Sequence, residues 1–173
     1  MLMIDPRISK SEALSTVQKQ EGIWGKLMKK KAPVTAVEQG WVPFWTHPYT
    51  LHTSRSIIHG RIAIETYQGL SAILPEDVTI RSEENIDGYQ LPPGSGEDRG
   101  KAYEALYWEA FAKEKKRAHI HVDIEPGFLL YVPYWILYRG QEHVEITAVD
   151  ALNGKIDPSM KDSILQSLAA ETV

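Results

Sequence analysis

The sequence predicts an α+β protein: two tandem αββ units with antiparallel sheets, each helix packed on one sheet face, plus a C-terminal helix. Three observations support this fold class. Val42-Pro43-Phe44-Trp45 recurs 90 residues later as Val132-Pro133-Tyr134-Trp135. Each copy is preceded by a helix-like pattern and lies among strand-like patterns, which is typical of one supersecondary unit used twice. After Pro158, apolar residues at helical spacing predict a closing helix.

Two weaker sequence matches extend the repeat on both sides. Glu12-Ala13-Leu14 matches Glu104-Ala105-Leu106 at an offset of 92 residues. Ile62-Ala63-Ile64-Glu65 matches Thr147-Ala148-Val149-Asp150 at an offset of 85. The three offsets decrease in chain order, as small changes in loop length would make them, so the repeat includes more than one short motif.

The first unit is predicted as helix, strand, strand. A helix is expected after Ser9 or Ser11, because serine caps the unpaired amides of a first turn and apolar residues follow at helical spacing. Pro33 prevents the helix from continuing. Beyond it, β-branched and aromatic residues predict strands over residues 34–45 and 56–64.

The second unit begins after the clearest linker in the chain, Pro92-Pro93-Gly94-Ser95-Gly96, whose residues rarely sit inside a regular element. This linker separates a first unit over residues 1–91 from a second unit over 97–173, and the two either fold separately or share one core or one continuous antiparallel sheet. Apolar residues from Tyr103 to Phe111 predict one stripe of an amphipathic helix. Trp108 lies off that stripe and needs a second contact surface.

Three extended segments follow in the second unit. His119–Glu125 alternates between polar and apolar residues, which is typical of a half-buried strand. Phe128–Tyr138 is apolar on both faces, and His143–Val149 alternates again. Together with the helix, these segments repeat the order of the first unit.

Pro43 and Pro133 occupy corresponding places in their predicted strands. Because proline cannot donate to a sheet ladder, we expect both strands to be edges there, or bulged. An edge strand flanked by aromatic residues is either covered by another element or used to bind a partner, and tryptophan is enriched at binding hot spots. The predicted binding surface consists of Trp41, Phe44, Trp45, Trp108, Tyr131, Tyr134 and Trp135.

The second unit resembles the PepSY domain, a small αββ module with a cystatin-like look. The resemblance depends on Val149-Asp150-Ala151 and Asn153-Gly154-Lys155 at the end of the hairpin, and on Ser11-Glu12-Ala13-Leu14 for the helix of the other copy. It implies a non-catalytic module of a kind often found beside peptidases or in membrane-associated and exported proteins. Such a module is expected to bind or restrain a partner.

A metal site is the alternative that the histidines suggest. His119, His121 and Asp123 share one face of their predicted strand, and two histidines with one carboxylate can form a facial triad. His143, on the next strand, is a candidate third ligand. These residues would make the chain a small metal-dependent enzyme, although a solvated strand face explains the same alternation more simply.

Two further groups of titratable residues have both a chemical and a structural interpretation. His47, His52 and His59 gather in the expected loop of the first unit, either as acid–base groups or as surface residues. Glu65 and Asp150 occupy equivalent positions, either as a carboxylate pair or as two residues that each organise their own turn.

Composition narrows the classes of function. A net charge of −4 argues against a nucleic-acid partner, and the absence of cysteine excludes disulfides, thiolate metal sites and cysteine nucleophiles. No apolar run approaches the roughly 18 residues of a membrane span, and the first residues do not form a signal peptide, so a cytoplasmic protein is expected. The sequence therefore predicts a non-enzymatic module, without a cofactor, that binds a protein, a peptide or a second copy of itself. An accessory subunit of a larger complex is a further alternative.

Overall fold

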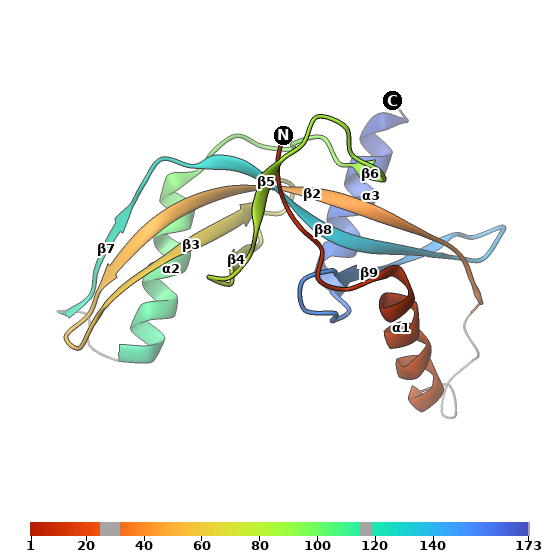
Figure 1. Cartoon of the computed structure of the whole chain (residues 1–173), viewed down its shortest axis with the longest axis horizontal. Helices are drawn as coiled ribbons and strands as arrows, with labels where there is room; N and C mark the ends of the chain where they lie inside the picture. Colours follow the sequence, from red (N-terminus) through yellow and green to blue (C-terminus); the bar gives the residue numbers. More distant parts are fainter. Residues whose placement is uncertain (25–31, 115–118, 173) are drawn as a thin grey trace.

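A computed structural model describes residues 1–24, 32–114 and 119–172 of the chain. Across these residues the protein has three helices and nine strands, and every strand belongs to one mixed sheet (Figure 1). The elements are β1 (Leu2–Ile4), α1 (Lys10–Trp24), β2 (Val34–His52), β3 (Ile57–Glu65), β4 (Ser71–Ile73), β5 (Ile80–Ser82), β6 (Tyr89–Gln90), α2 (Arg99–Glu114), β7 (His121–Ile124), β8 (Phe128–Arg139), β9 (Glu145–Asp150) and α3 (Pro158–Glu171). The predicted α+β class and C-terminal helix are confirmed.

Strands β2 and β8 form the centre of the sheet and cross the length of the molecule (Figure 1). They run antiparallel over residues 34–46 and 128–139, with Val42 directly opposite Val132. Neighbouring strands follow the order β4-β3-β2-β8-β1-β5, while β6 and β7 also pair with β2, and β9 with β8. Separate sheets for the two units are therefore wrong, because the two copies of the repeated motif pair with each other in one continuous sheet. The sheet is mixed rather than purely antiparallel, since β1 lies parallel to β8 and β6 parallel to β2.

This central pairing relates the two copies by an approximate two-fold axis. Strand β3 pairs with β2 as β9 pairs with β8, in both cases antiparallel. Strand β6 lies parallel to β2 as β1 lies parallel to β8. Phe44 is opposite Glu65 in one copy, and Tyr134 is opposite Asp150 in the other. Corresponding residues therefore have corresponding neighbours.

The helices α1 and α2 are capped in the same way. The Ser9 hydroxyl oxygen accepts a hydrogen bond from the Glu12 amide at 3.2 Å, and an Asp98 carboxylate oxygen accepts one from the Lys101 amide at 2.9 Å. Such side-chain caps satisfy amides that have no partner inside the helix. The caps align the helices at an offset of 89 residues, so the sequence match at 92 is out of register by almost one turn.

The two prolines of the repeat lie in central strands, and the expectation that they mark edges is wrong. The Pro43 carbonyl accepts a hydrogen bond from the Thr66 amide at 3.3 Å, and the Pro133 carbonyl accepts one from the Ala151 amide at 3.1 Å. Every second pair of opposite residues in an antiparallel ladder exchanges two hydrogen bonds, and each proline lies in such a pair, so its missing N–H removes one of the two bonds. The loss falls just beyond the paired residues of β3 and β9, where the chain turns away from the ladder.

The two faces of the sheet carry different helices, because successive strand residues point to opposite faces. On one face, Val42 and Phe44 belong to the main hydrophobic cluster together with Met160 and Ile164 of α3. On the other face, α2 covers the end of the sheet formed by β2, β3 and β7, and α1 covers the end formed by β8 and β9. Figure 1 shows α1 and α2 below opposite ends of the arched sheet.

The packing of α3 can be tested with two adjacent residues. Ile164 is fully buried in the main cluster, whereas Leu165 is 42% exposed. Ile164→Ala is expected to lower the free energy of unfolding by about 2–5 kcal/mol, because it leaves a cavity under the helix. Leu165→Ala should change it by less than about 1 kcal/mol. Urea unfolding of both variants checks this, and equal losses would contradict the orientation of α3.

Candidate functional site

The two copies of the fold can be compared residue by residue. A residue with the same role in both copies is explained by the shared fold, whereas a residue found in one copy alone is a candidate for function. Trp45 and Trp135 are such a pair. The Trp45 indole N–H donates to the Ser95 carbonyl at 2.9 Å, and the Trp135 indole N–H donates to the Ile8 carbonyl at 2.7 Å. Each tryptophan holds the segment that leads into its helix, so the fold alone explains why both are present.

The other aromatic residues of the central strands contribute to the interior. Trp41 donates its indole N–H to the Asp87 carbonyl at 2.8 Å. Their side chains face helices and loops because their strands are central rather than peripheral. The four residues from the predicted binding surface that are buried in this way are Trp41, Phe44, Tyr131 and Tyr134. Of the predicted surface, only Trp108 lies outside the central strands, and it is 49% exposed.

Trp108 belongs to a row of four aromatic rings on α2, which we call the aromatic ladder: Tyr103, Tyr107, Trp108 and Phe111. Tyr103 and Tyr107 stack with their centroids 6.2 Å apart. Trp108 makes edge contacts with Tyr107 at 5.8 Å and with Phe111 at 5.7 Å. Tyr103 is 46% exposed, like Trp108. The contacts hold adjacent rings together on the outer surface of the helix.

The predicted apolar stripe of α2 is confirmed for Leu106 and Ala110, which are buried, and is wrong for Tyr103, which is exposed; Tyr107 and Phe111 are half-buried. The residues of α2 that pack against the sheet are Ala102, Leu106 and Ala110. Their regular spacing of four residues is the feature of the sequence that indicates the buried face of α2. Leu106 and Ala110 belong to the predicted stripe, and Ala102 extends it by one turn toward the start of the helix. The small side chains of Ala102 and Ala110 let α2 approach the sheet closely.

Helix α1 has no counterpart of the aromatic ladder. The capping alignment places Leu14, Gln18, Lys19 and Gly22 at the four ladder positions. Both helices cover one end of the same face of the sheet, so this packing role does not require aromatic residues. The aromatic ladder is therefore a specialised feature of the second unit and the best candidate for a functional surface.

Of the proposed metal ligands, only His121 and Asp123 are in contact with each other. His121 Nε2 lies 3.1 Å from one Asp123 oxygen, and His52 Nε2 lies 3.4 Å from the other. His119 precedes β7 and is exposed. His143 follows β8, at the opposite end of the sheet from β7, so its placement as a neighbouring ligand is wrong. No group of three or more His, Cys, Asp or Glu residues is arranged to hold a metal ion within the described ranges.

The histidines of the first unit lie in strands rather than in a loop. His47 and His52 are in β2 and His59 is in β3. His47 is fully buried, and its Nδ1 lies 3.2 Å from the Glu125 carbonyl. Its ring covers Gly127, where a Cβ atom would come within 2.6 Å of the imidazole. His47 therefore packs at the junction of β7 and β8.

Glu65 and Asp150 each organise their own turn. The two Glu65 oxygens accept hydrogen bonds from the amides of residues 67 and 68 at 2.7 and 2.8 Å. One Asp150 oxygen accepts bonds from the amides of residues 152 and 153 at 2.7 and 3.3 Å. Their strands are separated by β2 and β8, which places β3 and β9 about 14 Å apart. They do not form a carboxylate pair.

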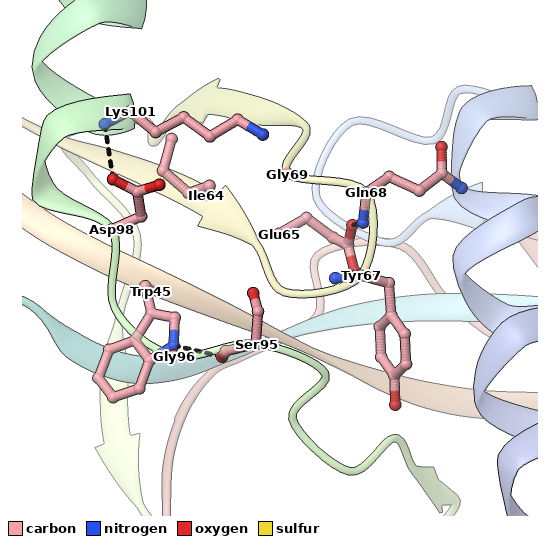
Figure 2. Close-up of a pocket in the computed structure, with 10 residues that line it drawn as sticks. All are labelled: Trp45, Ile64, Glu65, Tyr67, Gln68, Gly69, Ser95, Gly96, Asp98 and Lys101. Atoms are coloured by element: carbon pink, nitrogen blue, oxygen red, sulfur yellow. Dashed lines mark hydrogen bonds between the residues drawn. The ribbon is translucent and has the colours of Figure 1, made fainter.

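A hollow of about 150 Å³ lies between the Glu65 turn and the start of α2 (Figure 2). Lys101 extends across it toward Gly69, and Asp98 caps the helix beside it. A corresponding hollow lies between α1 and Gly154 in the other copy. Because both copies have this feature, it belongs to the helix–turn packing of the repeat. Nothing in its lining places a nucleophile next to a base.

No protein-family model matches the chain, and it has no match among curated proteins or solved structures. The resemblance to the PepSY domain therefore stays a prediction. No helix in the described part of the chain is long and apolar enough to cross a membrane. The fold defines an α+β protein with approximate internal two-fold symmetry, and its candidate functional surface is the aromatic ladder.

Asp150 gives a pH-dependent prediction. Burial, and to a lesser degree Asp157, raises the pKa of Asp150 above its ordinary value. Its contribution to stability is therefore complete below the unfolded-state pKa and is lost as the pH rises through the raised one. Asp150→Asn keeps an oxygen that can accept the turn amides but removes this titration.

The stability of Asp150→Asn relative to the unmodified chain is expected to increase as the pH rises from about 4, the ordinary pKa of aspartate, through the raised pKa of the folded state. Urea unfolding across this range measures the difference. Asp162→Asn, at an exposed position of α3, is the control and should show a smaller change. Parallel pH profiles for Asp150→Asn and the unmodified chain would contradict the role of burial.

Proposed function

We propose that this protein is a non-enzymatic protein-binding module that contacts its partner through the aromatic ladder of α2. The observation that carries the proposal is the difference between the two helices. Four aromatic residues occupy α2 positions at which α1 has Leu14, Gln18, Lys19 and Gly22. Exposed aromatic surface lowers solubility, so its presence in one copy favours a role in binding.

The chemistry of the ladder suits a protein partner. Tyrosine and tryptophan bury a large area on binding, lose few rotatable bonds and retain a polar group that can hydrogen-bond at an interface. The ring contacts within the ladder restrict its side chains before binding, which lowers the entropy cost of association. Trp108 and Tyr103, the more exposed members, are the expected hot spots.

The alternatives have weaker support. A metal-dependent enzyme would need ligands that converge, whereas His121 and His143 lie at opposite ends of the sheet. An accessory subunit remains compatible with the proposal, because the aromatic ladder would then bind the rest of the complex.

Site-specific photo-crosslinking can test the proposed surface. A photoreactive phenylalanine analogue at position 108 is expected to give a discrete crosslinked protein in cells that produce the chain. The same analogue at position 19, the equivalent place on α1, is the matched control. Trp108→Lys, which introduces the residue type found on α1, should reduce crosslinking from position 103 at least tenfold. Equal crosslinking from positions 108 and 19 would count against the proposal.

A further inference from the structure

We infer that His47 and Glu97 form an acid-sensitive latch, which holds the start of α2 on the sheet while the His47 imidazole is neutral and releases it when the imidazole gains a proton. The latch acts on the entry segment of α2, by which we mean residues 94–98. The inference concerns regulation and goes beyond the proposed function, because it holds whether or not the aromatic ladder binds a partner.

The entry segment is held on the sheet by polar contacts that involve side chains. All of its residues are exposed. The Trp45 indole N–H donates to the Ser95 carbonyl at 2.9 Å, and a Glu97 carboxylate oxygen accepts a hydrogen bond from the Gly127 amide at 2.8 Å. A segment that buries no apolar side chain can leave the sheet at a small cost in free energy.

The segment before α1 is held differently. The amides of Arg7 and Ile8 both donate to the Ala151 carbonyl, at 2.8 and 2.9 Å. Ile8 also packs against a hydrophobic cluster that contains Leu137. Backbone hydrogen bonds and apolar packing therefore do in this copy what polar side-chain contacts do in the other.

The two residues of the latch occupy places at which the other copy has apolar residues. The offset of 90 residues between the central strands relates His47 to Leu137. Glu97 and Ile8 each lie one residue before the capping residue of a helix. Since the repeat accepts apolar packing at these places, the fold does not require a buried imidazole with a carboxylate beside it. This pair is a specialised feature of one copy.

The His47 imidazole is fully buried, and only one of its two nitrogens has a hydrogen-bond partner in the described part of the chain. Its Nδ1 lies 3.2 Å from the Glu125 carbonyl, which can only accept, so Nδ1 carries the proton of the neutral ring. Its Nε2 is the nitrogen without a partner. A second proton goes to Nε2, where it meets no acceptor and gives the buried ring a charge. Both effects oppose protonation while the entry segment is in place.

Glu97 is the charged group that acts against these effects. One of its carboxylate oxygens lies 3.6 Å from His47 Nδ1, and its side chain is 34% exposed, so water screens part of its attraction for a protonated ring. From the other elements, His47 is faced by Ile62 of β3, which lies opposite it, and by Gly127, which lies against its ring. Tyr49 follows on the same face of β2, and burial raises the pKa of its phenol, which keeps it uncharged.

Two charged residues at the start of α2 belong to a different place. Asp98 and Lys101 line the hollow beside the Glu65 turn, which His47 does not line (Figure 2). Glu97 alone makes an ion-pair contact with His47 within the described ranges. The response of the latch to protons therefore depends on these two side chains.

Release of the entry segment lets the protonated ring reach water. Both ring nitrogens can then donate to solvent, and the proton itself comes from solvent. Histidine is the side chain that ordinarily titrates between about pH 5 and pH 8, so the latch responds in this range. The stability that the closed latch contributes is present above this range and is lost as the pH falls, because the released state binds one proton more than the closed state.

Exchange of two indole protons tests the latch, with one copy as the control for the other. The Trp45 indole N–H is bonded to the entry segment, and the Trp135 indole N–H is bonded to the segment before α1. Measured by NMR, the exchange rate of Trp45 relative to that of Trp135 should rise at least about tenfold between about pH 7.5 and about pH 5. The Gly127 amide should follow Trp45, because it donates to Glu97. A relative rate that stays constant, or one that falls, overturns the latch.

Substitutions at position 47 test whether the titrating group is His47. His47→Leu introduces the residue found at the equivalent place, and His47→Gln introduces a neutral polar side chain. In either variant the relative exchange rate should no longer depend on pH. His143→Leu, which replaces an exposed histidine at the opposite end of the sheet, is the control and should keep the dependence. Circular dichroism melting shows which variants are folded, and a dependence that persists in a folded variant at position 47 overturns the latch.

Glu97→Gln tests the direction of the effect and keeps an oxygen that can accept the Gly127 amide. Because it removes the attraction for the protonated ring, the relative exchange rate should begin to rise at a higher pH than in the unmodified chain. Glu125→Gln is the matched control, since Glu125 contacts His47 through its backbone carbonyl, and it should leave the profile unchanged. A rise that begins at a lower pH in Glu97→Gln would mean that protonation closes the latch, and it would overturn the inference.

Discussion

The antiparallel pairing of β2 with β8 is the interaction on which the rest of the structure depends. Val42 lies opposite Val132, so the central strand of each copy pairs with the central strand of the other. The main hydrophobic cluster contains residues from both strands and from α3, so neither copy encloses that core by itself. The same pairing generates the approximate two-fold axis, and the axis determines where every other pair of equivalent elements lies.

Because of the internal symmetry, a residue of one copy can be compared with the equivalent residue of the other. Trp45 and Trp135 donate equivalent hydrogen bonds, and Glu65 and Asp150 organise equivalent turns, so the fold accounts for all four. Helix α2 departs from this agreement, because the four residues of its aromatic ladder, two of them exposed, occupy positions at which α1 has no aromatic residue. The proposed function rests on this difference between the two copies.

Much of the local structure followed from short-range chemistry. Serine and aspartate at helix starts, glycine after the hairpins and alternation in the strands all act over a few residues, and they predicted the three helices and strands β2, β3, β7, β8 and β9. Strand β2 continues past the predicted end at residue 45 to His52, and the short strands β1, β4, β5 and β6 were not predicted. Gly69 and Gly154, with φ angles of 70° and 75°, show why the turn positions were readable. The prediction that Pro43 and Pro133 mark edge strands was wrong because the effect of a proline on strand pairing depends on which neighbouring strand its missing N–H faces. That neighbour lies elsewhere in the chain.

The sequence by itself determined the α+β class, the duplication and the closing helix, because periodicity and turn chemistry are properties of neighbouring residues. Only the tertiary structure decided that the two copies share one sheet and that Trp41 is buried while Trp108 is exposed. The two side chains have the same affinity for apolar surroundings. Their difference in burial arises from which strands and helices pack around them, and that arrangement is set by contacts between residues far apart in the chain.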